Sequence, residues 1–215
     1  MAQRVAAVAD VAVKVVLIGL LAHAILNPDL AQYQGKAMAG RALTFPLAAL
    51  AVPILWRVAG RARARPRERA RPFPFLVDLL VTAPFLIDVA GNALDLYDTI
   101  AWWDDLNHFM NWGLLTAAAA IALSWTRLDG LPRFGLAVGF AAVSAIGWEL
   151  AEYVTFIRFS AELATAYTDT LGDLTLGTLG GALGAAAVEL VRRTAAGRAH
   201  VSPEAAPPRR AGSAP

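Results

Sequence analysis

The chain has 215 residues, of which 57% are hydrophobic and 17% are charged, with a mean hydropathy of +0.50 and a formal net charge of +2. Soluble domains are about 45–50% apolar with roughly a quarter of their residues charged, so this composition indicates a membrane protein. The absence of cysteine excludes disulfides, thiolate metal sites and cysteine nucleophiles. Nucleic-acid binding is disfavoured, because no folded basic domain or aromatic-interleaved basic patch is recognisable.

Apolar segments recur along the chain, and each is long enough to cross a bilayer as an α-helix. The sequence predicts an all-α, polytopic transmembrane helical bundle over residues 1–194, with six spans at residues 5–26, 42–59, 73–94, 105–125, 134–156 and 170–191. The first segment has a second interpretation, because Arg4 precedes an apolar run and the tripeptide at 22–24 resembles a signal-peptide cleavage site. Asp10 and Lys14 interrupt this run, which favours a retained span.

Basic residues are concentrated in segments that would lie on one side of the membrane. The connection after the second span contains seven arginines: Arg57, Arg61, Arg63, Arg65, Arg67, Arg69 and Arg71. Such residues also suit anionic lipid headgroups, but the positive-inside rule explains them as a topology signal. We therefore expect a multi-pass protein of the cell (plasma or inner) membrane with both termini cytoplasmic. The proline-containing segment 195–215 is expected to be a disordered cytoplasmic tail.

Four of the expected spans place polar residues near their external ends. Residues three or four positions apart share one face of a helix. Groups with this spacing are Asp88/Asn92/Asp95, Asp104/His108, Glu149/Glu152 and Asp169/Asp173, with Asp105 beside the second group. A lipid-facing acid in the middle of a span costs about 2.5–3.5 kcal/mol. Glu149 and Glu152 are therefore expected to face the bundle interior or water.

The last span carries a stripe of small residues that predicts close helix packing. Its glycines form overlapping small-xxx-small patterns: Gly177, Gly180, Gly181 and Gly184. Asp169 and Asp173 precede them on roughly the same stripe. The face with the acids is thus the face packed against neighbours, which favours convergence of the acids from different helices.

Converging carboxylates require a compensating charge. Two carboxylates about 4 Å apart repel by roughly 4 kcal/mol at an effective dielectric constant of 20. Shared protons, a cationic His108 or a bound metal would relieve this repulsion, and carboxylates with one imidazole suit Mg²⁺, Mn²⁺, Ca²⁺ or Zn²⁺. We interpret His108 as a general acid or base oriented by Asp104. The candidate ligands of a divalent metal cation are Glu149, Glu152, Asp169 and Asp173, and an additional site comprises Asp88, Asn92, Asp95 and Asp105.

Three ordered blocks around these residues resemble a known family. They are WDDLNHF at 103–109, WELAEY at 148–153 and YTDTLGDL at 167–174. These blocks are similar to the Asp-x-x-x-His-Phe, Glu-x-x-Glu and Asp-Thr-x-x-Asp motifs of YjdF-like inner-membrane proteins. VanZ-like membrane proteins, which are linked to glycopeptide resistance, share a similar layout more distantly. The resemblance implies a helical membrane fold and a shared polar site, not a reaction.

Three functions remain open at this point. The first is an enzyme that acts on a lipid or lipid-linked substrate from the external side. The second is a proton- or cation-coupled transporter, with Asp78 as the candidate inward stepping stone. The third is a structural membrane protein in which the acid cluster only fixes helix packing. The expected partners are membrane lipids, and neither the oligomeric state nor the substrate follows from the sequence.

Overall fold

The computed structural model describes residues 1–62, 72–155 and 157–201, which form α-helices and short 3-10 turns without any strand. The α-helices are α1 (Ala2–Leu26), α2 (Met38–Ala49), α3 (Ala51–Ala62), α4 (Phe75–Ala93), α5 (Leu96–Thr99), α6 (Trp103–Leu123), α7 (Gly130–Thr155) and α8 (Ala166–Val201). The predicted all-α bundle is thereby confirmed.

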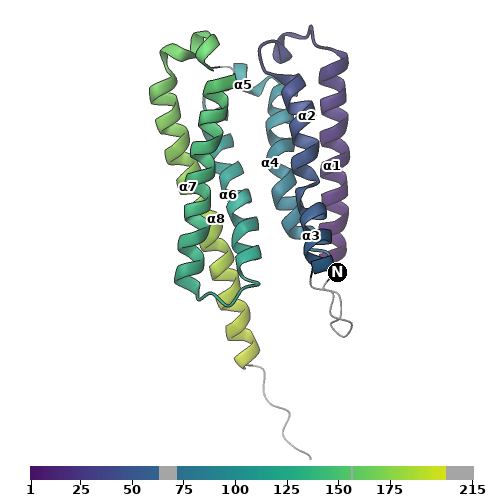
Figure 1. Cartoon of the computed structure of the whole chain (residues 1–215), viewed down its shortest axis with the longest axis vertical. Helices are drawn as coiled ribbons and strands as arrows, with labels where there is room; N and C mark the ends of the chain where they lie inside the picture. Colours follow the sequence, from purple (N-terminus) through teal and green to yellow (C-terminus); the bar gives the residue numbers. More distant parts are fainter. Residues whose placement is uncertain (63–71, 156, 202–215) are drawn as a thin grey trace, which may run out of the picture.

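The long helices run side by side along the longest axis of the molecule (Figure 1). Helices α1 to α4 form one group and α6 to α8 form another, while the short helix α5 lies at one end between them. We call this the α5 end, and the opposite end, where the chain begins, the N-terminal end. Helices α4 and α6 pack directly against each other and join the two groups.

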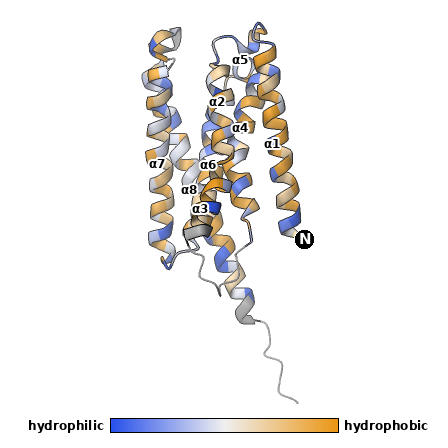
Figure 2. Ribbon diagram, turned by 45° about the vertical axis from the view of Figure 1, so that its right-hand side comes forward, coloured by the Kyte–Doolittle hydropathy of each residue, from blue (hydrophilic) through white to orange (hydrophobic). Residues whose placement is uncertain are grey.

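Five of the six expected spans coincide with helical segments long and apolar enough to cross a membrane. These segments are Gln3–Leu26, Met38–Ala59, Phe75–Ala93, Gly130–Phe159 and Ala166–Arg198. Hydrophobic residues extend along α1 and α7, and hydrophilic residues gather toward the ends (Figure 2). This pattern is that of a multi-pass membrane bundle.

The remaining expected span coincides with α6, which is the central helix of the second group. With 21 residues it is long enough to cross a bilayer, but its first half carries Asp104, Asp105, Asn107, His108 and Asn111. Helix α6 packs against α4, α7 and α8. Its neighbours therefore cover Asn107 and His108, which would be costly against lipid.

The second span consists of two helical segments rather than one. Helix α2 ends before Leu50 and α3 begins at Ala51. Pro53 lies in the first turn of α3, where a missing N–H is tolerated but the hydrogen-bond ladder from α2 cannot continue through it. The amide of Ile54 still donates to the Leu50 carbonyl at 3.0 Å, so the two segments remain nearly continuous.

Helix α1 is part of the packed bundle. Leu17 and Leu21 lie in the hydrophobic core with residues of α2 and α4. Lys14 forms ion pairs with Asp10 at 3.0 Å and with Asp78 of α4 at 2.5 Å. These contacts make the first predicted span part of the packed bundle.

The C-terminal boundary differs from the expected one, because α8 continues to Val201 and residues 195–201 are helical rather than disordered. This stretch is rich in alanine, a strong helix former, and the first proline comes only at 203. Residues 202–215 lie outside the described part of the chain. Of the arginines that served as a topology signal, Arg57 and Arg61 lie in α3, and the others lie outside the described residues: Arg63, Arg65, Arg67, Arg69 and Arg71.

Candidate functional site

Close packing of α6 on α8 positions the polar residues of both helices. A Cβ atom on Gly180 would overlap the carbonyl of Phe109, and one on Gly184 would overlap the carbonyl of Gly113. Only glycine lets the two backbones approach this closely. The predicted packed face of α8 is therefore confirmed, and Asp173, on the same helix, is held beside α6.

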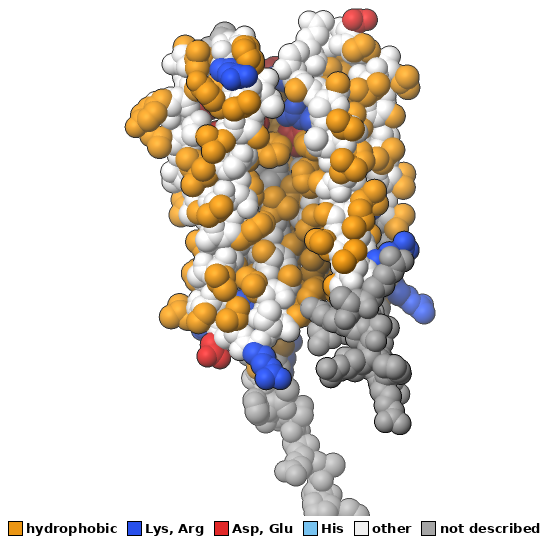
Figure 3. Space-filling view, in the orientation of Figure 1, with side chains coloured by type: hydrophobic (Ala, Val, Ile, Leu, Met, Phe, Trp, Pro, Cys, Tyr) orange, Lys and Arg blue, Asp and Glu red, His pale blue; other side chains and the backbone are white. Residues whose placement is uncertain are grey.

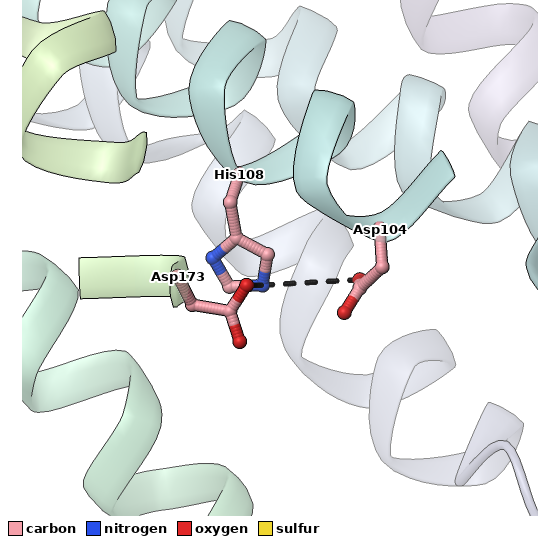
Figure 4. A group of neighbouring side chains, drawn as sticks. All are labelled: Asp104, His108 and Asp173. Atoms are coloured by element: carbon pink, nitrogen blue, oxygen red, sulfur yellow. Dashed lines mark ion pairs between the residues drawn. The ribbon is translucent and has the colours of Figure 1, made fainter. Parts of the chain in front are cut away.

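His108 lies where α6, α7 and α8 meet, and both nitrogens of its ring face carboxylates. Its Nε2 atom is 3.8 Å from Oδ1 of Asp104 and 3.7 Å from Oδ1 of Asp173. Its Nδ1 atom is 3.8 Å from Oε1 of Glu149. Figure 4 shows Asp104 and Asp173 converging on the imidazole from different helices. His108, Glu149 and Asp173 are buried, whereas the Asp104 side chain is 47% exposed.

This arrangement contains two overlapping groups that could hold a metal ion. They are Asp104/His108/Asp173 and His108/Glu149/Glu152, and the ligand atoms of each group lie within 4.8 Å of one another. Ligands about 2.1 Å from a shared ion lie roughly 3.0–3.4 Å from each other. The observed separations around His108 are slightly wider than that and longer than direct hydrogen bonds. The donor set of carboxylates and one imidazole fits a divalent cation.

The structure brings together five of the predicted site residues: Asp104, His108, Glu149, Glu152 and Asp173. Glu149 also accepts a hydrogen bond from Oγ1 of Thr170 at 3.2 Å, which ties α7 to α8. By contrast, Asp169 is exposed and belongs to neither group, although it was expected to be a ligand. It lies one turn before Asp173, in the first turn of α8.

The expected additional site does not form as a unit. Asp105 is exposed on α6, and Asp95 has a left-handed conformation (φ of 59°) at the start of α5, where its carbonyl accepts from Thr99. Asn92 is buried but donates to the carbonyl of Asp88 within its own helix. Asp88 alone of these four lines the cavity described next.

A cavity of about 280 Å³ opens beside His108, between the two groups of helices. Four helices contribute polar side chains at its α5 end and apolar ones one or more turns deeper. From the α5 end inward these are Arg41 then Phe45 on α2, Asp88 then Phe85 on α4, His108 then Leu115 on α6, and Glu152 then Phe140 on α7. The space-filling view shows this hollow, with acidic and basic atoms toward its upper end and hydrophobic ones below (Figure 3).

Arg41 is a cavity residue that the sequence analysis did not single out, because no motif or helical spacing connects it with the acids. Its Nε atom donates to Oδ2 of Asp88 at 2.7 Å, and its Nη2 atom donates to Oδ1 at 3.3 Å. Tyr97 of α5 also donates to Oδ1 of Asp88 at 2.9 Å. Asp88 is therefore compensated by Arg41, whereas the carboxylates around His108 have no arginine or lysine partner among the ion pairs of the described residues.

The fold and this site define the class as a multi-pass α-helical membrane protein with a polar cavity at one end of the bundle. A family model described as "Predicted membrane protein (DUF2238)" matches residues 11–194, and the chain belongs to this family. The matched region contains every residue that lines the cavity. No curated protein and no solved structure matches the chain. The distant likeness to VanZ-like proteins is not supported by these comparisons.

Proposed function

We propose that this protein is a membrane-embedded enzyme that acts, with a divalent cation held at His108, on a lipid or lipid-linked substrate with an anionic headgroup. The observation that carries this proposal is the two-part cavity, whose charged end adjoins His108 and whose deeper part is apolar. An amphiphile would place its headgroup at the charged end and its chain between Phe45, Phe85 and Phe140. Ligand sites typically combine an apolar lining with a few converging polar groups in this way.

The positions around His108 suggest distinct roles for its neighbours. A metal-ligating histidine commonly donates its other ring N–H to a carboxylate, which orients the ring. Nε2 would thus bind the cation together with Asp104 and Asp173, while Nδ1–H faces Glu149. In this arrangement His108 is a ligand rather than the general acid or base that its sequence context suggested. A bound divalent cation would supply Lewis-acid activation of a water or phosphoryl oxygen.

The proposed location follows from the charges at the two ends. Arg57 and Arg133 lie at the N-terminal end of the bundle, and the positive-inside rule makes that end cytoplasmic. The α5 end, with the cavity mouth, then faces the exterior of the cell membrane. The likeness of the three blocks around His108, Glu149 and Asp173 to those of YjdF-like inner-membrane proteins supports the same location.

The transporter alternative is weakened by the position of Asp78. This residue is buried between α4 and α1, where it shares Lys14 with Asp10, and it is not among the residues that line the cavity. It is therefore poorly placed to pass a proton or cation inward from His108. A purely structural role accounts for buried charges but not for the cavity beside them.

The test is to delete the gene, to restore it as the wild type or as a variant, and to measure the lipid composition of each strain. We expect the deletion to change the amount of a lipid or lipid-linked intermediate, and His108→Gln to fail to restore it, because loss of a ligand weakens binding of the cation on which the reaction depends. His23→Gln is the matched control, since His23 contacts Tyr33 at 3.0 Å and does not line the cavity.

The control variant should restore the lipid profile when protein levels, measured by immunoblot, are equal. Full restoration by His108→Gln at equal protein level would show that the proposed enzyme function is wrong.

A further inference from the structure

A chain of hydrogen-bonded side chains crosses the wall of the cavity from α2 to α6. Its members, in order, are Arg41, Asp88, Tyr97, Asn107 and Asn111. All five line the cavity. The last link is from Nδ2 of Asn111 to Oδ1 of Asn107 at 2.6 Å. This chain is separate from the carboxylates that surround His108.

The direction of every bond in this chain follows from the charge of Asp88. A carboxylate accepts hydrogen bonds only, so the Tyr97 hydroxyl must donate to it. Burial, together with the nearby Asp88 carboxylate, raises the pKa of Tyr97, which keeps the hydroxyl proton in place. Because that single proton is directed at Asp88, the Tyr97 oxygen must accept from the amide group of Asn107.

The same logic settles the orientation of both asparagine amides, which geometry alone often leaves ambiguous. Nδ2 of Asn107 donates to Tyr97, so its Oδ1 atom faces Asn111 and accepts from Nδ2 of that residue. Oδ1 of Asn111 is then the end of the chain. It is buried and has no hydrogen-bond partner among the described residues. A buried acceptor of this kind is costly unless a donor reaches it.

We propose that Asn111 Oδ1 accepts a hydrogen bond from a hydroxyl or amide N–H of the bound amphiphile, so that the cavity selects lipids with a free donor next to the headgroup. This inference rests on the proposed function, whose substrate it narrows. Asn111 follows His108 by three residues on α6, which is about 4.5 Å along the helix axis. The donor therefore lies just below the anionic group, where a lipid carries its glycerol, sugar or sphingoid hydroxyl. A lipid fully esterified at that position lacks such a donor.

The probe is a lysophosphatidic acid with a lauroyl chain, compared with its 2-O-methyl ether. The pair differs only in the hydroxyl proton and one methyl group. Dissociation constants are measured on the purified full chain in detergent. We expect the wild type to bind the free-hydroxyl lipid about tenfold more tightly. Asn111→Leu, which keeps the volume but removes the acceptor, should reduce this ratio to about one.

Tyr97→Phe tests whether the Tyr97 hydroxyl, rather than packing of its ring, fixes the orientation of Asn107 and Asn111. Phenylalanine leaves the Arg41–Asp88 ion pair in place but no longer fixes the orientation of the two asparagines, so the ratio should also approach one. Asn27→Leu is the control, because Asn27 donates to the carbonyl of His23 and does not line the cavity, and it should keep the tenfold ratio.

Equal binding of both lipids by the wild type would overturn the inference, as it would show that Asn111 Oδ1 is satisfied by water only. An undiminished ratio in Tyr97→Phe would also overturn it. The outcome is distinguishable from failure of the proposed function. If the wild type binds both lipids equally but deletion of the gene changes the lipid composition, only the proposed selectivity is wrong. If the binding ratio is tenfold but deletion changes no lipid, the protein binds lipid without catalysing the proposed reaction.

Discussion

Two buried groups of ionisable side chains join α7 to α8, one at each end of the bundle. They differ in how completely their acidic and basic side chains pair with each other. At the N-terminal end, Nε of Arg133 lies 2.5 Å from Oε1 of Glu189, and Nη2 lies 2.8 Å from Oε2. Nη1 of Arg133 also donates to the Leu128 carbonyl at 2.8 Å. One positive charge meets one negative charge in two parallel bonds, a geometry typical of a structural ion pair.

At the α5 end, one imidazole faces several carboxylates, and its nitrogen atoms lie 3.7–3.8 Å from their oxygen atoms. Carboxyl groups outnumber basic side chains there, and His108 lines a cavity. Burial of a charge is therefore not by itself a sign of function in this protein. Three features mark the His108 group as a ligand site: the excess of carboxyl groups over basic side chains, the distances between them, which exceed those of direct hydrogen bonds, and the adjoining cavity.

The largest expected difference between the two groups is in stability. Arg133→Ala leaves Glu189 buried without a partner, and such a change costs about 3 kcal/mol. Replacing both residues, as Arg133→Met with Glu189→Leu, should recover most of that loss because no unpaired charge remains. Thermal unfolding in detergent measures both effects. A single variant as stable as the wild type would show that this pair does not hold α7 to α8.

Divalent cations should act on the α5 end alone. A cation at 100 times its dissociation constant stabilises the folded state by about 2.7 kcal/mol. We expect Mn²⁺, Mg²⁺ or Zn²⁺ to raise the unfolding temperature of the wild type and of the Arg133→Met/Glu189→Leu variant, and EDTA to reverse the rise. His108→Gln should show no such rise. An equal rise in His108→Gln would place the cation elsewhere.

The smallest expected effect comes from neutralising one carboxyl group at each end of the bundle, and the change in stability should have opposite signs at the two ends. In EDTA, Asp173→Asn should stabilise the protein by roughly 1 kcal/mol, a fraction of the about 4 kcal/mol repulsion between close carboxylates. Glu189→Gln should instead destabilise it, because it breaks a closed pair with Arg133. Unfolding temperatures of the two variants, compared in EDTA, measure the difference. Loss of stability in Asp173→Asn would indicate that this carboxyl is a structural hydrogen-bond partner.

Much of the fold and part of the site follow from local sequence pattern. The length of the apolar segments predicts membrane-crossing helices, since lipid leaves no other partner for backbone groups. The spacing of Glu149 with Glu152, and of Asp104 with His108, predicts shared helix faces because it depends only on 3.6 residues per turn. These local relations are all present in the structure.

Which acids meet was decided by tertiary structure. Asp169 and Asp173 have the same spacing relation on α8, yet only Asp173 reaches His108, because the contact of Gly180 and Gly184 with α6 sets where the two helices approach. Likewise, nothing in the sequence pairs Arg41 with Asp88, which are 47 residues apart and come together only when α2 packs near α4. Helix periodicity is a local property of the chain, whereas the convergence of side chains from α2, α4, α6, α7 and α8 depends on how those helices pack.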